Sequence, residues 1–197
     1  MAKKYIKNFY NRDRLALTSI SRCGYCNKEQ IKEFIADKRI TNYLRDGIVI
    51  KETFNKNNGE KLEAYKLTAK GRNLLEKEWG VKGHYIAQSI SHDLAIANKY
   101  FSLSQSERET WKTETEIREQ FEARLYEIKS SNYEKYEEIQ KMIEDKLISV
   151  PDCYFQLENK IEVYYEVITN SYSRSEIEAK ERFIEFMNIK NYQTERV

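Results

Sequence analysis

The stretch that decides the fold of the first half of the chain is RITNYLRDGIVIKETFNKNNGEKLEAYKLTAKGRNLL, residues 39–75. It opens with Ile40 and Leu44, four positions apart and therefore on one face of a helix, and a glycine three residues later ends that helix. A run rich in β-branched residues follows at 48–54 and predicts a strand. The Asn-Asn-Gly triplet after it is typical of a hairpin turn, so residues 61–67 are predicted to return as the second strand.

Helical patterns surround this hairpin. Asn27, with Gln30 three residues later, forms a capping box that starts one of them. The predicted helices cover residues 12–22, 27–36, 37–47 and 68–80. The resulting order is helix, helix, helix, strand, strand, helix, which is the winged-helix arrangement.

Two pieces carry a resemblance to a known family. Residues 43–47, YLRDG, end a helix and lead at once into an apolar strand, and residues 65–71, YKLTAKG, close the hairpin and open the next helix. Together with the order of elements, they resemble bacterial winged helix-turn-helix DNA-binding domains over about residues 10–80. The resemblance implies that the third helix enters the major groove and that the hairpin, as the wing, contacts the backbone or minor groove.

The third predicted helix carries side chains suited to this task. Arginine can read guanine and asparagine can read adenine in the major groove. Tyr43 has two possible positions, packed inward or against a phosphate. The candidate DNA-binding residues are Lys38, Arg39, Thr41, Asn42, Tyr43 and Arg45 on the helix, and Lys56, Asn57, Asn58 and Lys61 on the wing; Lys3, Lys4, Lys7, Arg12 and Arg14 add possible phosphate contacts.

Charge is distributed unevenly along the 197 residues. The net charge is only +2, but residues 1–80 hold 18 Lys and Arg against 10 Asp and Glu, so that 1–80 carries +8 and 81–197 carries −6. A basic half followed by an acidic half indicates two domains with different tasks, 1–80 and 81–197. The basic domain is the one expected to face a polyanion such as DNA.

Composition excludes several classes of protein. No segment is long and apolar enough to span a bilayer, and the N-terminus lacks the apolar stretch of a secretory signal, so we expect a cytoplasmic protein. Three cysteines are too few for a disulfide framework. Cys23 and Cys26 supply only half of a tetrahedral zinc site, and His92 next to Asp93 fits a packed histidine. We therefore expect no metal at these residues and no cofactor.

The second half reads as a mixed α/β domain. Residues 111–117 fit either an edge strand or part of a helix that runs to 128. The other predicted elements are helices at 84–101 and 131–147, a hairpin of strands at 148–157 and 161–168, and a helix at 173–188. Few residues follow that last helix, which leaves little room for a further strand.

Two carboxylates of this hairpin resemble the outline of the PD-(D/E)xK nucleases. Asp152 follows a proline and Glu166 lies on the partner strand. The resemblance implies that such a pair holds Mg²⁺ and that a lysine two positions later helps to activate water. Here that position is Ile168, and only Lys180 on the next helix could replace the lysine. We therefore interpret Asp152 and Glu166 as vestigial and expect neither a catalytic nor a metal site.

The whole chain resembles the replication-relaxation type of accessory proteins of plasmids and other mobile elements. The sequence thus predicts an α+β protein that is not an enzyme: an N-terminal winged helix-turn-helix and a small mixed α/β domain for dimerisation or partner contact. The expected function is sequence-specific double-stranded DNA binding, as a homodimer, that regulates transcription, replication or transfer of a plasmid, phage or other mobile element. Two alternatives remain open, a metal-dependent PD-(D/E)xK nuclease and a winged-helix module that binds protein.

Overall fold

A computed structural model describes residues 4–55, 59 and 61–197 of the chain. Its fold is mixed α+β, and it divides into two compact units, Met1–Leu103 (unit 1) and Ser104–Val197 (unit 2). None of the helices in these described ranges combines the length and the apolar character needed to cross a lipid bilayer.

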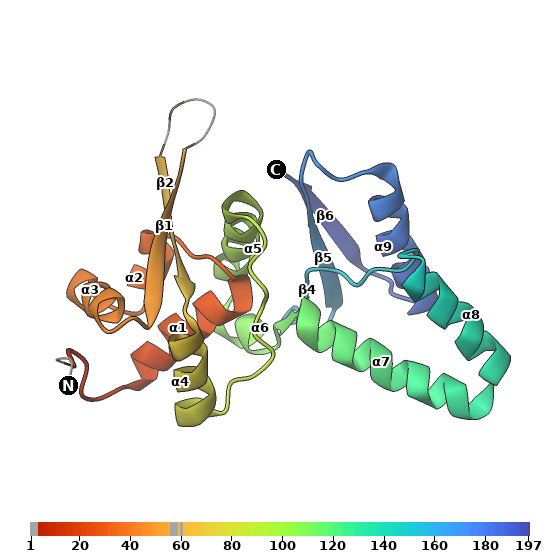
Figure 1. Ribbon diagram of the computed structural model, residues 1–197, viewed down its shortest axis with the longest axis horizontal. Helices are drawn as coiled ribbons and strands as arrows, with labels where there is room; N and C mark the ends of the chain where they lie inside the picture. Colours follow the sequence, from red (N-terminus) through yellow and green to blue (C-terminus); the bar gives the residue numbers. More distant parts are fainter. Residues whose placement is uncertain (1–3, 56–58, 60) are drawn as a thin grey trace. The chain divides into compact units, whose positions relative to one another are not determined.

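Unit 1 consists of helices around a two-stranded hairpin (Figure 1). The strands pair antiparallel from Val49 opposite Leu67 to Asn55 opposite Lys61. The elements are α1 (Asn11–Cys23), α2 (Lys28–Lys32), α3 (Asp37–Arg45), β1 (Val49–Asn55), β2 (Lys61–Leu67), α4 (Ala69–Trp79) and α5 (Ile90–Ser102). This is the order predicted for the first 80 residues, with one further helix.

Local signals start and end these elements as expected. The predicted capping box is present, since Asn27 accepts from the Gln30 amide and the Gln30 side chain accepts from the Asn27 amide. Thr68 caps α4 by accepting from the Gly71 amide. Helix α2 is shorter than predicted, because the residues from Glu33 to Ala36 turn out of the helix rather than extend it.

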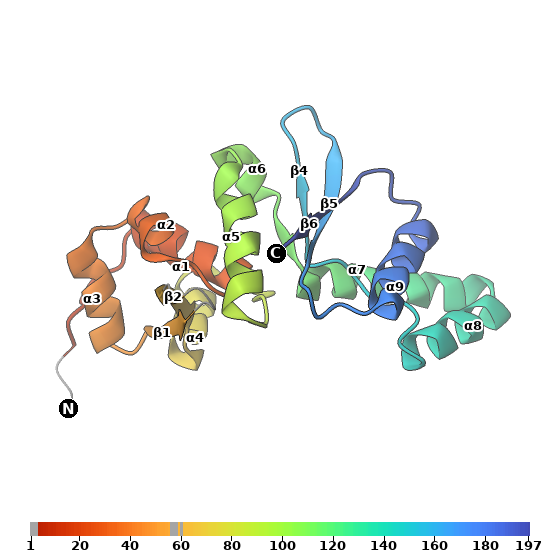
Figure 2. The same cartoon turned by 90° about the horizontal axis from the view of Figure 1, so that it is seen from above.

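Helix α1 forms the centre of unit 1. Its side chains Ala16, Leu17 and Ile20 are buried, and it contacts α4, β2 and α5. Figure 2 shows α5 next to α1, which it contacts. On α5, Ile96 and Ala97 have no exposed surface. This packing assigns residues 81–103 to unit 1, so the division falls at 103/104 rather than at the 80/81 boundary that the charges suggested.

The chain between α4 and α5 is extended, where the sequence predicted that a helix begins at residue 84. The Tyr85 amide donates to the Ser21 carbonyl of α1, at 2.9 Å. The His84 ring lies 2.6 Å from Ser21 Oγ and 3.1 Å from Glu76 of α4. These bonds hold the segment against two helices in an extended conformation, and α5 starts only at the Ser89 cap.

Unit 2 is a four-stranded sheet with helices (Figures 1 and 2). Its strand order is β3-β4-β5-β6; β5 pairs antiparallel with β4 and parallel with β6. The elements are α6 (Gln105–Glu109), β3 (Lys112–Thr113), α7 (Glu114–Ser131), α8 (Tyr133–Glu144), β4 (Cys153–Gln156), β5 (Glu162–Ile168), α9 (Arg174–Phe186) and β6 (Tyr192–Arg196).

Two expectations for unit 2 change here. Residues 111–128 contain both of the alternatives, a two-residue strand that leads straight into α7. The expectation of little room for a further strand is wrong, because Tyr192–Arg196 forms β6. Parallel strands need a crossover connection, and α9 supplies it between β5 and β6.

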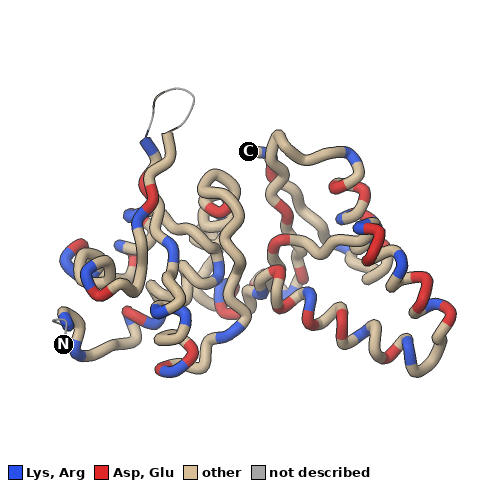
Figure 3. The backbone as a smooth tube through the Cα atoms, in the orientation of Figure 1, with Lys and Arg blue, Asp and Glu red and all other residues tan. Residues whose placement is uncertain are grey.

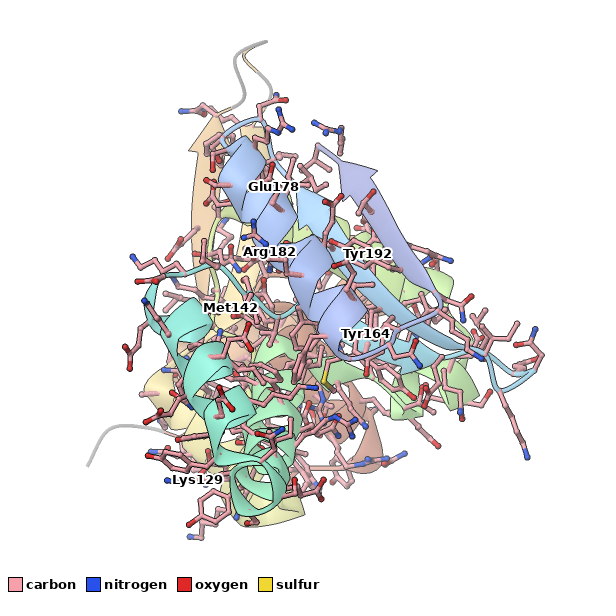
Figure 4. The ribbon with its side chains drawn as sticks, turned by 90° about the vertical axis from the view of Figure 1, so that its right-hand side faces the viewer. Lys129, Met142, Tyr164, Glu178, Arg182 and Tyr192 are labelled. Carbon is pink, nitrogen blue, oxygen red and sulfur yellow. The ribbon has the colours of Figure 1, made fainter. Side chains whose placement is uncertain are left out.

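The core of unit 2 lies between the sheet and its helices. Phe183 of α9 is fully buried and meets Phe121 of α7, with ring centroids 5.3 Å apart. Tyr154 of β4 belongs to the same cluster, and Tyr164 of β5 packs against it. Figure 4 shows α9 lying across the strands that carry Tyr164 and Tyr192. The sheet face that bears Tyr164 is therefore the face that α9 covers.

Candidate functional site

Helix α3 has one buried face and one exposed polar face. Ile40 and Tyr43 are buried. Figure 3 marks the basic positions of this helix. On the opposite face Lys38, Thr41 and Arg45 are exposed and Asn42 is half-buried. This face offers two cations, a hydroxyl and an amide, which are the groups that contact phosphates and base edges.

Arg39 does not belong to that exposed face, and the sequence prediction is corrected here. Its Nε and Nη2 atoms donate to the two carboxylate oxygens of Asp13 on α1, at 2.7 and 2.9 Å. Nη2 also donates to the Asn8 carbonyl, at 2.7 Å. Asp13 is completely buried, and the Arg39 side chain is only 18% exposed. A buried carboxylate in bidentate contact holds the guanidinium against the protein.

Tyr43 takes the inward one of its two possible positions. It has no exposed surface, and its hydroxyl donates to Asp13 Oδ1 at 2.6 Å. Burial and the neighbouring Asp13 raise the pKa of the Tyr43 phenol. Tyr43 therefore connects α3 to α1 inside unit 1 and presents nothing to a ligand.

The wing candidates are only partly described. Lys56, Asn57 and Asn58 lie outside the described residues, whereas Lys61 is exposed at the start of β2. Other lysines of the hairpin are paired, Lys51 with Glu63 at 2.8 Å and Lys66 with Glu52 at 2.7 Å. These pairs cancel part of the positive charge along the strands.

The cysteine and histidine candidates lie in the interior of unit 1. Cys23 and Cys26 are buried free thiols, and the Cys26 backbone forms a bridge with Tyr65. His92 is 1% exposed, with Nδ1 at 3.1 Å from Asp93 Oδ1. Over the described part of the chain, no group of three His, Cys, Asp or Glu side chains is placed to hold a metal ion.

Asp152 and Glu166 face each other in unit 2, and both are completely buried. The register that pairs Cys153 with Tyr165 places Asp152, just before β4, opposite Glu166 on β5. The Asp152 amide donates to Glu166 Oε2 at 2.9 Å, and the Val167 amide donates to Asp152 Oδ2 at 2.8 Å. The sheet thus brings the two carboxylates together on adjacent strands.

Lys180 completes this cluster from α9. Its Nζ lies 3.0 Å from Glu166 Oε1 and donates to the Val150 carbonyl at 2.5 Å. The Tyr172 hydroxyl donates to the same Glu166 oxygen at 2.8 Å. Lys180 precedes the inward-facing Phe183 by three positions, so helical spacing alone places it on the buried side of α9.

Burial dominates the electrostatics of this cluster. Loss of solvation, together with the negative charge of Asp152, raises the pKa of Glu166 to about 7, although Lys180 and the Tyr172 hydroxyl oppose the shift. The same burial and the two carboxylates raise the pKa of Tyr172. Glu166 can therefore exchange a proton near neutral pH, and the two carboxylates supply the oxygen donors that hard divalent cations prefer.

No protein-family model, no curated protein and no solved structure matches this chain. Function is therefore inferred from the residues and their geometry.

Proposed function

We propose that this protein binds double-stranded DNA in a sequence-specific way, through a winged helix-turn-helix formed by α1–α4 and the β1–β2 hairpin. The observation that carries the proposal is the exposed polar face of α3, with Lys38, Thr41, Asn42 and Arg45 opposite buried Ile40 and Tyr43. The resemblance to replication-relaxation type proteins supports a role in transcription, replication or transfer of a plasmid, phage or other mobile element.

The roles of the side chains follow from their chemistry. An α-helix with its side chains is about 10–12 Å in diameter, which matches the major groove of about 12 Å width, and the nine residues of α3 extend ~13 Å along their axis. Arg45 would read guanine, Asn42 would read adenine, and Lys38 would hold a phosphate. Arg39, whose guanidinium is bound by Asp13, acts as a positioning residue that fixes α3 on α1.

The wing and the assembly complete the proposal. Lys61, with Lys56, Asn57 and Asn58, would contact the backbone or minor groove beside the helix. A homodimer would present two copies of α3 to a palindromic site, and unit 2 is the candidate dimerisation part.

The test is selection from a random duplex pool at two salt concentrations, followed by sequencing of the retained DNA. We expect one enriched motif and an affinity that falls steeply as salt rises. Asn42→Ala and Arg45→Ala should each relax the motif at one position and cost ~1–3 kcal/mol of binding free energy. Lys38→Ala should weaken binding to every sequence and lower the salt slope by about 1.

Lys141→Ala is the matched control, because Lys141 is an exposed lysine of α8 in unit 2. It should leave both motif and affinity unchanged. Salt-sensitive retention without enrichment would contradict sequence-specific binding. No retention at low salt would contradict DNA binding altogether and favour the protein-binding module.

The second candidate function is metal-dependent DNA cleavage in unit 2. The observation that favours it is Lys180, whose ammonium lies 3.0 Å from Glu166 and could replace the lysine that the resemblance to PD-(D/E)xK nucleases requires at position 168, where this chain has isoleucine. Asp152 and Glu166 would hold a divalent cation, which activates water when bound. Lys180 would supply positive charge beside them.

Cleavage of plasmid DNA with Mg²⁺ or Mn²⁺ tests this candidate. Asp152→Asn and Lys180→Met should each abolish cleavage, whereas Glu158→Gln, at an exposed carboxylate beyond the end of β4, should not change it. Absence of cleavage with either ion, or cleavage that survives Asp152→Asn, would contradict the nuclease.

A further inference from the structure

Unit 1 contains a cavity of about 230 Å³ whose lining shares only Lys4 with the candidate DNA contacts. It lies between the chain that leads into α1, the turn after α3, and α4. Its apolar walls are Phe9, Ile48 and Leu74. The ring of Trp79 meets Phe9 edge to face, with ring centroids 6.0 Å apart, and so contacts one of these walls.

Lysine side chains line the same cavity. Lys70 donates from Nζ to the Asp46 carbonyl at 2.5 Å. Lys4 and Lys77 are exposed and have neither a carboxylate nor a hydrogen-bond acceptor as partner among the residues the structure describes. Two unpaired ammonium groups therefore border an apolar space, which is the arrangement that favours an anion with an apolar body.

The one carboxylate at this cavity is already engaged. Asp46 Oδ1 accepts from the Tyr5 amide at 2.9 Å, and Oδ2 accepts from the Ile6 amide at 2.8 Å. These two bonds direct the negative group at the backbone rather than into the cavity. They leave the ammonium groups of Lys4 and Lys77 and the amide of Asn73 as polar groups available to a ligand.

The hydrogen bonds from the Tyr5 and Ile6 amides to Asp46 also hold the chain that forms one wall of the cavity. Ile6 has no exposed surface, so the chain before α1 is anchored both by Asp46 and by burial. Arg39 adds a third attachment through the Asn8 carbonyl, at 2.7 Å. A cavity between fixed segments is preformed, which lowers the entropic cost of binding.

We propose that this cavity is a binding site for a small amphiphilic anion, with one compact apolar group and one carboxylate. Its volume is below the ~300–1,000 Å³ of pockets for drug-sized ligands, which limits the apolar group to about one small ring system. The apolar group packs between Phe9 and Leu74, and the carboxylate meets Lys77 and Lys4. This proposal goes beyond DNA binding and does not depend on it.

Calorimetric titration of the full chain with 2-naphthoate tests the site, with uncharged 2-naphthalenemethanol as the comparison. We expect the alcohol to bind at least tenfold more weakly, and Lys77→Gln to weaken 2-naphthoate about fivefold. Lys82→Gln, at an exposed lysine outside the cavity, should have no effect. Equal affinity for the acid and the alcohol, or no binding of the acid, would overturn the proposal.

Two further measurements locate the ligand. Leu74→Trp fills the cavity and should abolish binding of 2-naphthoate. The thermal unfolding midpoint of this variant shows whether it folds. If it does not fold, Asn73→Trp is the alternative cavity-filling variant. In the unaltered chain, the indole N–H resonance of Trp79 should shift with 2-naphthoate and that of Trp111 should not. A shift of both resonances or of neither, or binding that survives in a folded cavity-filling variant, would overturn the assignment.

Discussion

At the scale of the residue, the buried carboxylate of Asp13 joins three parts of the proposed DNA-binding unit. This carboxylate accepts from Arg39, from the Tyr43 hydroxyl at 2.6 Å and from the Tyr10 amide at 2.7 Å. These bonds connect the start of α1 to α3. The orientation of the polar face of α3 therefore depends on a residue that contacts no ligand.

Asp13→Asn should lower the free energy of unfolding by ~3 kcal/mol or more, because it leaves the partly buried Arg39 without its counter-charge. Urea unfolding followed by circular dichroism measures the change. Asp37→Asn is the control, since the Asp37 side chain is 57% exposed and pairs at 3.1 Å with Lys28, whose side chain is 45% exposed. That control should change the free energy by less than ~1 kcal/mol. Equal effects of the two substitutions would refute this role of Asp13.

Glu166 provides a pH prediction. Its pKa is raised from 4.5 to about 7, so in the folded chain it stays protonated up to near-neutral pH, whereas in the unfolded chain it ionises near 4.5. The folded state is therefore favoured at low pH, and this stabilisation is lost as the pH rises from 4.5 through about 7.

Carboxyl ¹³C NMR of Glu166 measures that titration directly. Asp152→Asn removes a neighbouring negative charge and should lower the midpoint, and Lys180→Met removes the counter-charge and should raise it. Glu158→Gln should leave it in place. A midpoint near 4.5 in the unaltered chain would show that burial does not control this carboxylate.

At the scale of the element, local sequence patterns predicted α1, α3, α4 and the two hairpins, because apolar spacing and caps act over a few residues. They missed β6, because the strand YQTER has no buried side chain and is held by parallel pairing to β5. They did not reveal that Lys180 pairs with Glu166, because Glu166 lies 14 residues earlier, on another element. The prediction that Arg39 lies on the exposed face of α3 failed for the same reason. Its partner Asp13 lies on α1, and spacing within α3 does not reveal it.

The start of α4 lies very close to the residue that precedes β1. A Cβ atom at Gly71 would lie 2.2 Å from the Ile48 carbonyl oxygen beside β1. Gly71→Ala should therefore push α4 away from the hairpin and lower the free energy of unfolding by ~1–3 kcal/mol. Glu78→Ala, at an exposed position of the same helix, should change it by less than ~0.5 kcal/mol. Urea unfolding compares the two, and an unchanged Gly71→Ala variant would mean that this contact relaxes freely.

At the scale of the whole molecule, the observed division sharpens the charge asymmetry that the sequence indicated. Unit 1 holds 20 Lys and Arg against 11 Asp and Glu, a net charge of +9, and unit 2 carries −7. Moving the boundary from 80/81 to 103/104 thus adds α5 to the basic unit without diluting its charge. The correspondence between charge and task stays a prediction, now made for the folded units.

A comparison of fragments tests this division. Residues 1–103 should unfold cooperatively, whereas 1–80 lacks α5 and exposes the α1 surface that α5 covers; loss of fully buried Ile96 alone costs ~2–3 kcal/mol. Circular dichroism during heating measures the unfolding of both fragments. If 1–80 melts at as high a temperature as 1–103, the boundary returns to 80/81.

If unit 1 carries DNA binding, 1–103 should also bind duplex DNA at low salt more tightly than the full chain, because the net charge of −7 on unit 2 is then absent. Fluorescence anisotropy measures that affinity, with residues 104–197 as the control expected not to bind; binding by 104–197 instead would assign the DNA contacts to unit 2.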